Sequence, residues 1–343
     1  MLNHLKNLCN INGISGDEGR VRDYICSQID GKAEYKIDNL GNVIAFKKGK
    51  KHAKHRVMIS AHMDEVGAIV TYINADGTLK CVPVGGVDPR VMFGRRVTVG
   101  NNEITGIIGS KAVHNLSAEE RKSAVKFDEM NIDIGCTSKE QTEKYIKLGD
   151  SVCFVSDFFE FGENKIKGKA IDDRAGCAIM LQLIEQELEC DVYFAFVVQE
   201  EVGLRGAEAA AYTINPDYAF VLEATTAADI PTAQNDKKVC ILGEGPVVSF
   251  MDRHTIYNKE LYNMCFETAQ RNGIPCQTKT MVAGGNDAGA IHVSRGGVKT
   301  CAISVPCRYL HSPSCVIDKN DFKNTYKLTN KLLDRIFIND IGN

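Results

Sequence analysis

Two adjacent carboxylates, Glu200 and Glu201, directly follow the apolar run of residues 192–198. We expect this run to form a buried strand, which would place both acids at its end. Neighbouring anions that leave water together repel each other, and each loses much of its hydration energy unless a cation or a hydrogen-bond donor compensates it. A metal ion is the obvious compensating partner, provided that other ligands converge on the same place.

Other metal-competent side chains fall at the ends of the remaining predicted strands. They are His62 and Asp64 after strand 57–60, Glu223 after strand 218–222, and His311 in a loop after strand 300–304. Asp172 and Asp173 come just before a predicted helix at 175–188. Because sites in open α/β sheets form beyond the carboxyl ends of the strands, we expect these side chains to meet at one edge of the sheet.

The donor set suits two divalent cations. Imidazole and carboxylate ligands favour zinc, cobalt or manganese. A carboxylate can bridge two such ions, and a water between them becomes a strong nucleophile near neutral pH. A further carboxylate that is not a ligand can take the proton of this water and pass it to a leaving amine. Since neighbouring side chains at a strand end point in opposite directions, Glu200 and Glu201 could divide these two roles.

Each of these residues also has a simpler structural interpretation. Asp64 could cap a turn or helix, and Glu200 and Glu201 could stabilise the N-terminus of the following helix. His62 and His311 could be structural histidines without a ligand. The convergence of so many ligand types at predicted strand ends favours the metal hypothesis over these separate explanations.

The order of predicted elements indicates two domains. Strands and helices alternate in residues 1–66 and 163–343, which is typical of an α/β domain with a mostly parallel sheet covered on both faces. Residues 67–162 instead show short strands separated by turn signals, with one helix expected near 119–127. We therefore predict a discontinuous catalytic α/β domain interrupted by a β-rich insertion at 67–162.

Composition excludes several classes of protein. The chain has 343 residues, 44% hydrophobic and 25% charged, as an ordinary soluble enzyme has. A net charge of -3 gives no footprint for nucleic acid or an anionic membrane, and the apolar runs are too short to span a bilayer. The 13 cysteines are scattered without a CxxC pair, so we expect buried thiols in a reducing cytoplasm.

Six motifs in residues 62–314 together resemble the M42 family of metallo-aminopeptidases. They are, in order, HMDEVG, IDDRAG, QEEVGLRGA, VLEATTAADIP, GGNDAGAIH and RYLHSP. The resemblance implies a phosphorylase/hydrolase-like, doubly wound α/β domain that holds a co-catalytic metal pair. It also implies that the insertion is PDZ-like and serves oligomerisation. Family members often assemble as tetrahedral dodecamers, so a homo-oligomer is expected.

The resemblance further implies a role for each matched residue. The first metal would be held by His62, Asp172 and Glu223, and the second by Asp172, Glu201 and His311. Glu200 would be the general base, and Asp64 would accept a hydrogen bond from the His62 ring. The family often has Asp where this chain has Glu223, which leaves the denticity there open. Two zinc or cobalt ions are expected, with manganese as a third candidate.

The function predicted from these residues is a cytoplasmic aminopeptidase that hydrolyses N-terminal residues from short peptides. Its partners would be peptides and copies of itself, with no nucleic acid and no membrane. Two alternatives stay open: a metal-dependent deacylase on the same scaffold, and a non-enzymatic metal-binding scaffold. A glycanase activity is disfavoured, because the chain has no tryptophan on which a sugar could stack.

Two further segments are expected near the substrate. The glycine-rich run 284–289 lacks the Gly-Lys-Ser/Thr ending of a phosphate-binding loop, so we interpret it as a tight turn that shapes the substrate pocket. His254 is expected to be no metal ligand and to lie near the substrate or a subunit contact. The N-terminal peptide MLNHLKNLCN has helical spacing and does not read as a signal peptide.

Overall fold

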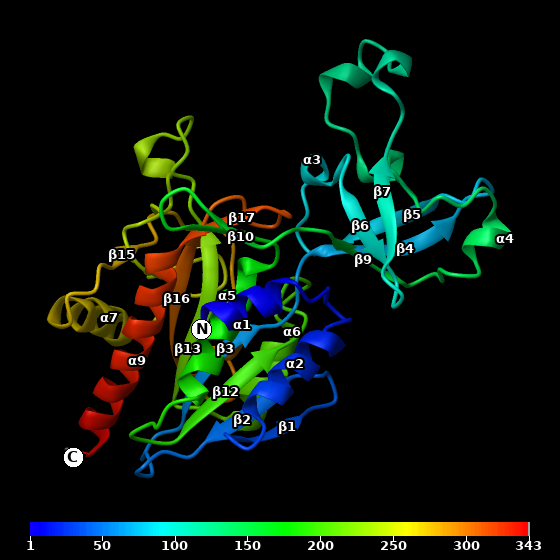
Figure 1. The fold of residues 1–343 in the computed structure, drawn as a ribbon. Coiled ribbons are helices and arrows are strands. Elements are labelled where there is room, and N and C mark those ends of the chain that lie inside the picture. Colours follow the sequence, from blue (N-terminus) through cyan, green and yellow to red (C-terminus); the bar gives the residue numbers. More distant parts are fainter. Residues whose placement is uncertain (342–343) are drawn as a thin grey trace.

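The computed structural model describes residues 1–341. An eight-stranded sheet with helices on both faces forms the larger part of the molecule, and a closed β-barrel projects from one side of it (Figure 1). The chain is thus a mixed α/β protein with several sheets. None of its described helices combines the length and the apolar character needed to cross a membrane.

The large sheet has the strand order β1-β2-β12-β3-β13-β16-β14-β15. Its strands are β1 (Glu34–Ile37), β2 (Val43–Lys47), β3 (Val57–His62), β12 (Val192–Val197), β13 (Tyr218–Thr226), β14 (Val247–Val248), β15 (Gln277–Thr278) and β16 (Lys299–Cys307). The central strands β12, β3, β13 and β16 are mutually parallel. Their carboxyl ends therefore lie along the same edge of the sheet.

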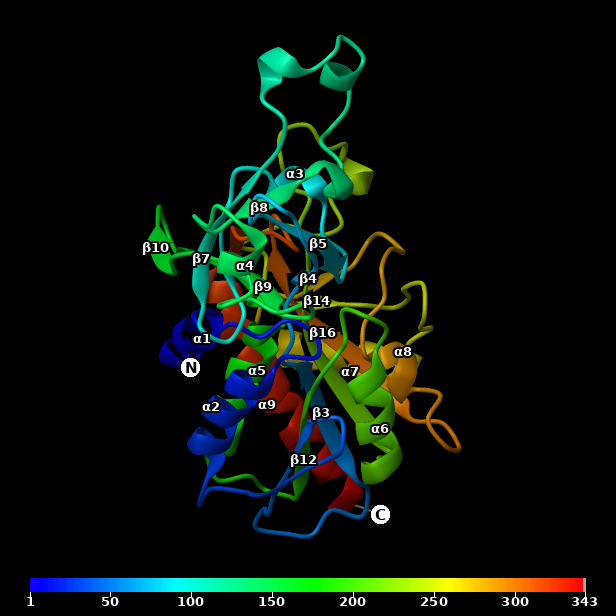
Figure 2. The ribbon, with the colours of Figure 1, turned by 90° about the vertical axis from the view of Figure 1, so that its right-hand side faces the viewer.

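The central strands are apolar on both sides because helices cover both faces of the sheet. In β13, Phe220 and Leu222 pack into one core cluster, and the alternating Ala219 and Val221 pack into the other. This alternation follows from the pleat, which points successive side chains to opposite faces. Figure 2 shows α6 and α8 on the opposite side of the sheet from α1 and α2.

The helices divide between the two faces according to these clusters. One face carries α1 (Leu2–Cys9), α2 (Gly19–Ile29), α5 (Ile171–Ile184), α7 (Lys259–Arg271) and α9 (Lys319–Ile341). The other face carries α6 (Arg205–Ile214) and α8 (Ala288–Ile291). A 3-10 turn, η4 (Asn235–Lys237), lies in the long connection between β13 and β14.

The barrel has its own hydrophobic core. Its strands are β4 (Gly67–Ile73), β5 (Leu79–Val84), β6 (Arg96–Val99), β7 (Ile104–Gly109), β8 (Asn131–Asp133) and β9 (Ser151–Phe154), and its short helices are α3 (Pro89–Met92) and α4 (Lys139–Thr142). The helix expected near 119–127 is wrong. Residues 113–129 instead hold three short 3-10 turns, η1 (Val113–Asn115), η2 (Glu120–Lys122) and η3 (Phe127–Glu129). None of these turns has a buried residue, so no packed face supports a longer helix.

A small antiparallel sheet follows the barrel in the chain. It consists of β10 (Phe159–Phe161), β11 (Lys165–Gly168) and β17 (Cys315–Asp318). Every barrel strand comes from residues 67–154, whereas β10 and β11 pair with a strand near the C-terminus. The domain boundaries at 67 and 162 stay a prediction, which the position of the barrel strands supports.

Candidate metal centre

The predicted ligands lie at the carboxyl edge of the parallel strands. His62 is the last residue of β3 and pairs with Val197, the last residue of β12. Glu223 was expected just after a strand, but β13 continues to Thr226 and Glu223 lies within it, opposite Ser304. Both side chains are buried, and His62 Nε2 is 3.8 Å from Glu223 Oε2.

Asp64 organises the turn that carries the two adjacent acids. Its carboxylate accepts hydrogen bonds from the backbone N–H groups of Glu200, at 3.0 Å, and Glu201, at 3.1 Å. The Ser15 hydroxyl donates to the same carboxylate at 2.6 Å. Burial disfavours the charged form of Asp64, but the hydrogen bonds from His62, Ser15 and the Glu200 backbone lower its pKa. Asp64 therefore fixes the backbone of both acids to the end of β3.

The ring of His62 is held through Nδ1. This atom lies 3.1 Å from the backbone carbonyl of Asp64 and 3.4 Å from its carboxylate. Because a carbonyl can only accept, Nδ1 is the donor and Nε2 is left free on the other side of the ring. The expected partner is thus present: Nδ1 faces both the backbone carbonyl and the carboxylate of Asp64, and the same carboxylate also accepts from the N–H groups of the following turn.

Glu200 and Glu201 follow a strand, as expected, but they lie beyond its end and not on the strand itself, and their opposite orientation stays a prediction. Strand β12 ends at Val197, and both acids lie in a turn entered through Gln199, whose φ is 58°. The carbonyl of Glu200 accepts from the N–H of Gly203 at 2.9 Å. This turn, and not the strand pleat, directs the two side chains.

Asp172 lies between the two imidazoles. Its Oδ1 is 3.5 Å from His62 Nε2, and its Oδ2 is 3.5 Å from His311 Nε2. It belongs to the first turn of α5, where Asp172 and Asp173 depart from helical geometry and are joined by a cis peptide bond. The same His311 Nε2 atom is 3.4 Å from Glu201 Oε2. One carboxylate thus faces both halves of the site.

Three groups of side chains place their ligand atoms within 4.8 Å of one another. They are His62 with Asp172 and Glu223, Asp172 with Glu201 and His311, and His62 with Glu200 and Glu201. The first two groups share Asp172 and contain the same residues as the two ligand sets suggested by the motifs. The five predicted ligands are therefore brought together, with Glu200 beside them.

The negative charge of the buried carboxylates in the centre is not fully compensated by the neighbouring side chains. Burial raises the pKa of Glu201 to about 7 and raises that of Glu223 well above its usual range. Burial opposes protonation of His311, but Asp172 and Glu201 nevertheless raise its pKa to about 10. Asp172 Oδ1 and Glu223 Oε1 are buried and have no hydrogen-bond partner among residues 1–341. Unpaired buried oxygens beside imidazole nitrogens are the donor set that divalent metals take, so these residues fit a metal centre.

The barrel touches this centre directly. The Gly86 carbonyl, in the connection between β5 and α3, accepts from His311 Nδ1 at 3.0 Å. A Cβ on Gly86 would lie 3.2 Å from His311 Nδ1, and one on Gly85 would lie 3.2 Å from the Cβ of Glu201. Glycines at both positions let the barrel backbone approach two predicted ligands. The sequence indicated a turn at Gly85 and Gly86 but not its contact with His311, because a Gly-Gly pair looks like any other turn signal.

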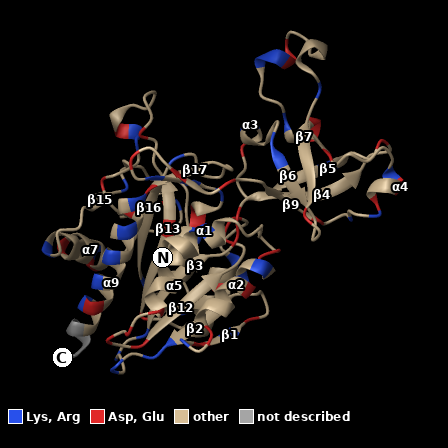
Figure 3. Ribbon diagram, in the orientation of Figure 1, with Lys and Arg blue, Asp and Glu red and all other residues tan. Residues whose placement is uncertain are grey.

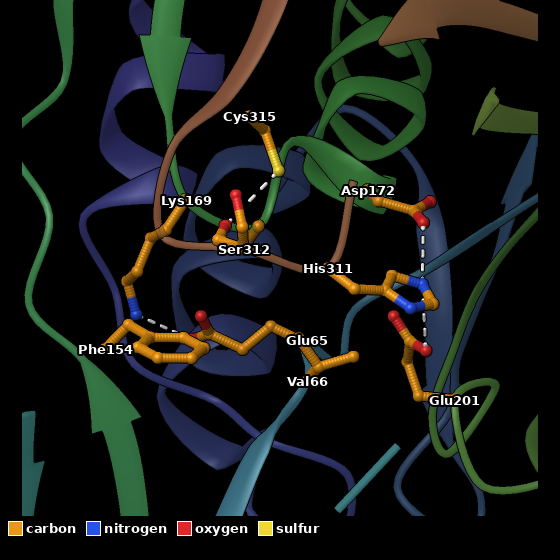
Figure 4. A pocket seen from close by; sticks show the side chains of 10 residues that line it. Glu65, Val66, Phe154, Lys169, Asp172, Glu201, His311, Ser312 and Cys315 are labelled. Atoms are coloured by element: carbon orange, nitrogen blue, oxygen red, sulfur yellow. Dashed lines mark hydrogen bonds and ion pairs between the residues drawn. The ribbon is translucent and has the colours of Figure 1, made fainter. Parts of the chain in front are cut away.

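Figure 4 shows the side of the centre that faces the barrel, with His311 between Asp172 and Glu201. Behind these residues a cavity of only about 10 Å³ remains. It is walled by the buried ion pair between Lys169 and Glu65, whose Nζ and Oε1 are 2.7 Å apart. A volume of this size holds about one water molecule, so the centre is closed on this side.

A cleft of about 820 Å³ opens on the other side of the centre. It is lined by Asp172, Glu200, Glu201, Glu223 and His311 at one part, and elsewhere by residues 283–286, His254, Lys237 and Lys279. The glycine-rich run thus borders the cleft, as expected from its sequence. His254 also lines the cleft and belongs to none of the ligand groups found among residues 1–341.

Two buried acids near the centre were not assigned a role from the sequence. Asp173 accepts a hydrogen bond from the Gly176 N–H at 2.8 Å. Asp287, the residue before α8, has no hydrogen-bond partner for either carboxylate oxygen within the described chain. Burial raises its pKa to about 7. A short acid within a glycine-rich run gives no sequence signal of burial, so only the fold reveals it.

Comparison with known sequences places the chain among peptidases. The family model described as M42 glutamyl aminopeptidase matches residues 41–328. The "Putative aminopeptidase" of Acetivibrio thermocellus is 40% identical over 96% of this chain and 97% of its own length. The lysyl aminopeptidase of Pyrococcus furiosus is 33% identical over 97% of this chain and 96% of its own length.

Solved structures agree with these relatives. The TET aminopeptidase of Thaumarchaeota archaeon SCGC AB-539-E09 is 34% identical, with a TM-score of 0.94 over 99% of this chain and 97% of its own. The TET1 peptidase of Pyrococcus horikoshii is 36% identical, with a TM-score of 0.86 over 97% of this chain and 98% of its own. That peptidase can assemble into a tetrahedron or a large octahedral shell.

The contact between barrel and centre makes a prediction about metal affinity. In Gly86→Ala the new methyl group would press on the His311 ring, so we expect metal affinity to fall about tenfold, as is typical when a partner behind a ligand is disturbed. Equilibrium dialysis against buffered zinc measures this, and thermal unfolding of the metal-free protein checks the fold. Gly109→Ala is the matched control, since a Cβ there meets nothing within 4 Å. Equal affinity in both variants would contradict the prediction.

Proposed function

The chain belongs to the M42 peptidase family, and from this premise we propose that it is a dinuclear metallo-aminopeptidase that removes N-terminal residues from short peptides. The observation that carries the proposal is the pair of ligand groups that share Asp172. A single carboxylate facing two imidazoles from opposite oxygens is the arrangement that a bridging ligand requires.

In the proposed centre, His62, Asp172 and Glu223 hold one ion, and Asp172, Glu201 and His311 hold the other. Zinc or cobalt suits these nitrogen and oxygen donors, and manganese is the third candidate. When bound, the two ions supply Lewis-acid chemistry, which makes water nucleophilic near neutral pH and stabilises negative charge on a carbonyl oxygen. The buried, unpartnered oxygens of Asp172 and Glu223 support this assignment.

Glu200 is the proposed general base. It lines the cleft beside the ligands, and its backbone N–H is fixed by Asp64. Burial, reinforced by nearby carboxylates, raises the pKa of Glu200 well above its usual range. A carboxylate of raised basicity can accept a proton from the attacking water and hold it until the amine departs. Asp64 acts through its neighbours, because it positions both the His62 ring and the Glu200 turn.

The closed side of the centre supports exopeptidase action. The space behind Asp172, Glu201 and His311 is about 10 Å³, which leaves no room for a peptide to extend past the ligands. The 820 Å³ cleft on the other side has room for the remainder of a short substrate. A chain end therefore fits the centre, whereas the middle of a long peptide does not.

The larger architecture completes the proposal. We assign the α/β part to a doubly wound, phosphorylase/hydrolase-like catalytic domain formed by residues 1–66 and 163–343. The insertion at 67–162 is proposed to be the PDZ-like oligomerisation domain of a homo-oligomer, with a dodecamer as the expected assembly. The shell-forming peptidase of Pyrococcus horikoshii supports this. The 13 cysteines, which are scattered along the chain without a CxxC pair, support a reducing cytoplasmic location.

A first test concerns Glu200→Gln. The variant keeps the shape of the side chain but removes its basicity, so we expect bound metal to be retained and kcat to fall by about two to four orders of magnitude. Hydrolysis of leucine p-nitroanilide, together with elemental analysis, measures both quantities. Unchanged turnover in a metal-replete variant would remove Glu200 from the role of base.

A second test concerns the ligands. His62→Ala and His311→Ala each remove one nitrogen donor, so we expect elemental analysis after dialysis to show less metal per chain than in the wild type. His114→Ala is the control, because His114 lies in an exposed turn of the barrel region. Two ions retained per chain in both variants would contradict the assignment of His62 and His311 as metal ligands.

A third test separates the aminopeptidase from the deacylase alternative. The wild-type enzyme should cleave a dipeptide with a free N-terminal amine and leave its N-acetyl derivative intact, because the closed side of the centre offers no space for an acyl group. Chromatography of both reaction mixtures gives the answer. Preferred cleavage of the acetyl group would favour the deacylase.

A further inference from the structure

The titratable side chains that line the cleft are sorted by charge. At the proposed metal centre they are the four carboxylates and the His311 ring. Over the rest of the cleft lining, within the part of the chain that the structure describes, they are Lys237, His254 and Lys279 alone. Figure 3 shows acidic and basic residues mixed along the chain as a whole, so this separation is a local property of the cleft.

Lys279 is held in place at the edge of the sheet. It directly follows β15, and its backbone N–H donates to the Val248 carbonyl at 3.1 Å. The residue is half-buried, and its ammonium group donates to the Ala283 carbonyl at 3.0 Å. An ammonium group has three protons, so this contact leaves donors for a ligand. Among residues 1–341, no acidic side chain forms an ion pair with Lys279.

Lys237 approaches the same cleft from the η4 turn. Thr280 joins the two segments, since its N–H and its hydroxyl both donate to the Val239 carbonyl, at 3.0 and 3.1 Å. Asp229, an acid in the same connection, is already taken by Arg308 at 2.6 Å. Lys237 has no ion-pair partner among the acids that the structure describes. Two lysines thus line one cleft, and neither forms an ion pair with an acid among the residues that the structure describes.

The position of the lysines suits a short substrate. Strand β15 is three strands away from β13, which carries Glu223, so the two backbones are about 14 Å apart at the usual spacing within a sheet. The long stem of Lys279 reduces that gap. Two extended residues span about 7 Å. A short peptide can therefore place its N-terminal end at the metal centre and reach the lysines with another group.

We propose that Lys237 and Lys279 form an anion subsite that binds a carboxylate of the substrate. The carboxylate is either the acidic side chain of the N-terminal residue or the free C-terminus of a di- or tripeptide. Both sources present the same planar anion, to which an ammonium group makes charge-assisted hydrogen bonds. The inference rests on the proposed aminopeptidase function and gives it a substrate class.

The test compares Lys237→Met and Lys279→Met with wild type on two substrate pairs. Glutamate and leucine p-nitroanilides differ in the side-chain carboxylate, and Leu-Gly and Leu-Gly amide differ in the C-terminal one. We expect the kcat/KM ratio of one pair, charged over neutral, to fall about tenfold in each variant, which is what losing a hydrogen bond to a charged group produces. The pair that responds identifies the source of the carboxylate.

Lys238→Met is the matched control, because Lys238 is the sequence neighbour of Lys237 and does not line the cleft. Methionine keeps most of the apolar stem, so packing is preserved. High salt should reduce the preference of the wild type, since it screens partly exposed charges. Ratios that stay at the wild-type value in both lysine variants would overturn the subsite, as would an equal fall in the control.

A failure of the anion subsite can be distinguished from a failure of the proposed aminopeptidase function. Turnover of leucine p-nitroanilide by the wild type tests the aminopeptidase activity itself. If no substrate is cleaved, calorimetry on the metal-loaded protein still tests the subsite with L-glutamate against L-glutamine, and L-leucine against L-leucinamide. Tighter binding of one anionic probe, lost in Lys279→Met, supports the subsite, and equal affinities within both pairs overturn it.

Discussion

The burial of several carboxylates around two imidazoles is the constraint on which the rest of the structure depends. Taken alone, each buried anion would lose hydration that the protein interior does not replace. The protein answers with three kinds of compensation. Backbone N–H groups satisfy Asp64, the imidazoles face Asp172 and Glu201, and the oxygens that are left over at Asp172 and Glu223 point to a cation. The buried carboxylates, the imidazoles and the backbone donors therefore have to be understood together, because each compensates the charge of another.

That balance explains why the α/β architecture is suited to the site. Parallel strands deliver the end of β3 and the middle of β13 to the same edge, so that His62 and Glu223 meet although they are 161 positions apart in the chain. The turn after β12 then adds Glu200 and Glu201, held by the carboxylate of Asp64. A rigid, doubly covered sheet keeps these positions fixed, because helices pack against both of its faces.

The barrel has a part in the site as well as its own core. The Gly86 carbonyl orients the ring of His311, and the close approach of the barrel backbone shuts the centre on one side. His311, a predicted ligand from the C-terminal part of the chain, is thus held by a turn next to the barrel strand β5. The centre is closed on one side and opens into a large cleft on the other, with four acids and His311 at one part of the cleft and two lysines at another.

The sequence by itself determined the donor types, the predicted ligand set, the strand–helix alternation and the β-rich insertion, because these follow from residue chemistry and from periodicity along the chain. It also indicated that the glycine-rich run borders the pocket. The tertiary structure alone decided how these parts meet. The turn of Glu200 and Glu201, the extension of β13 past Glu223, the Gly86 contact, the burial of Asp287 and the charge sorting of the cleft all depend on side chains distant in sequence. Local propensity carries no information about such neighbours, since their contacts exist only once the sheet, the barrel and the loops have packed together.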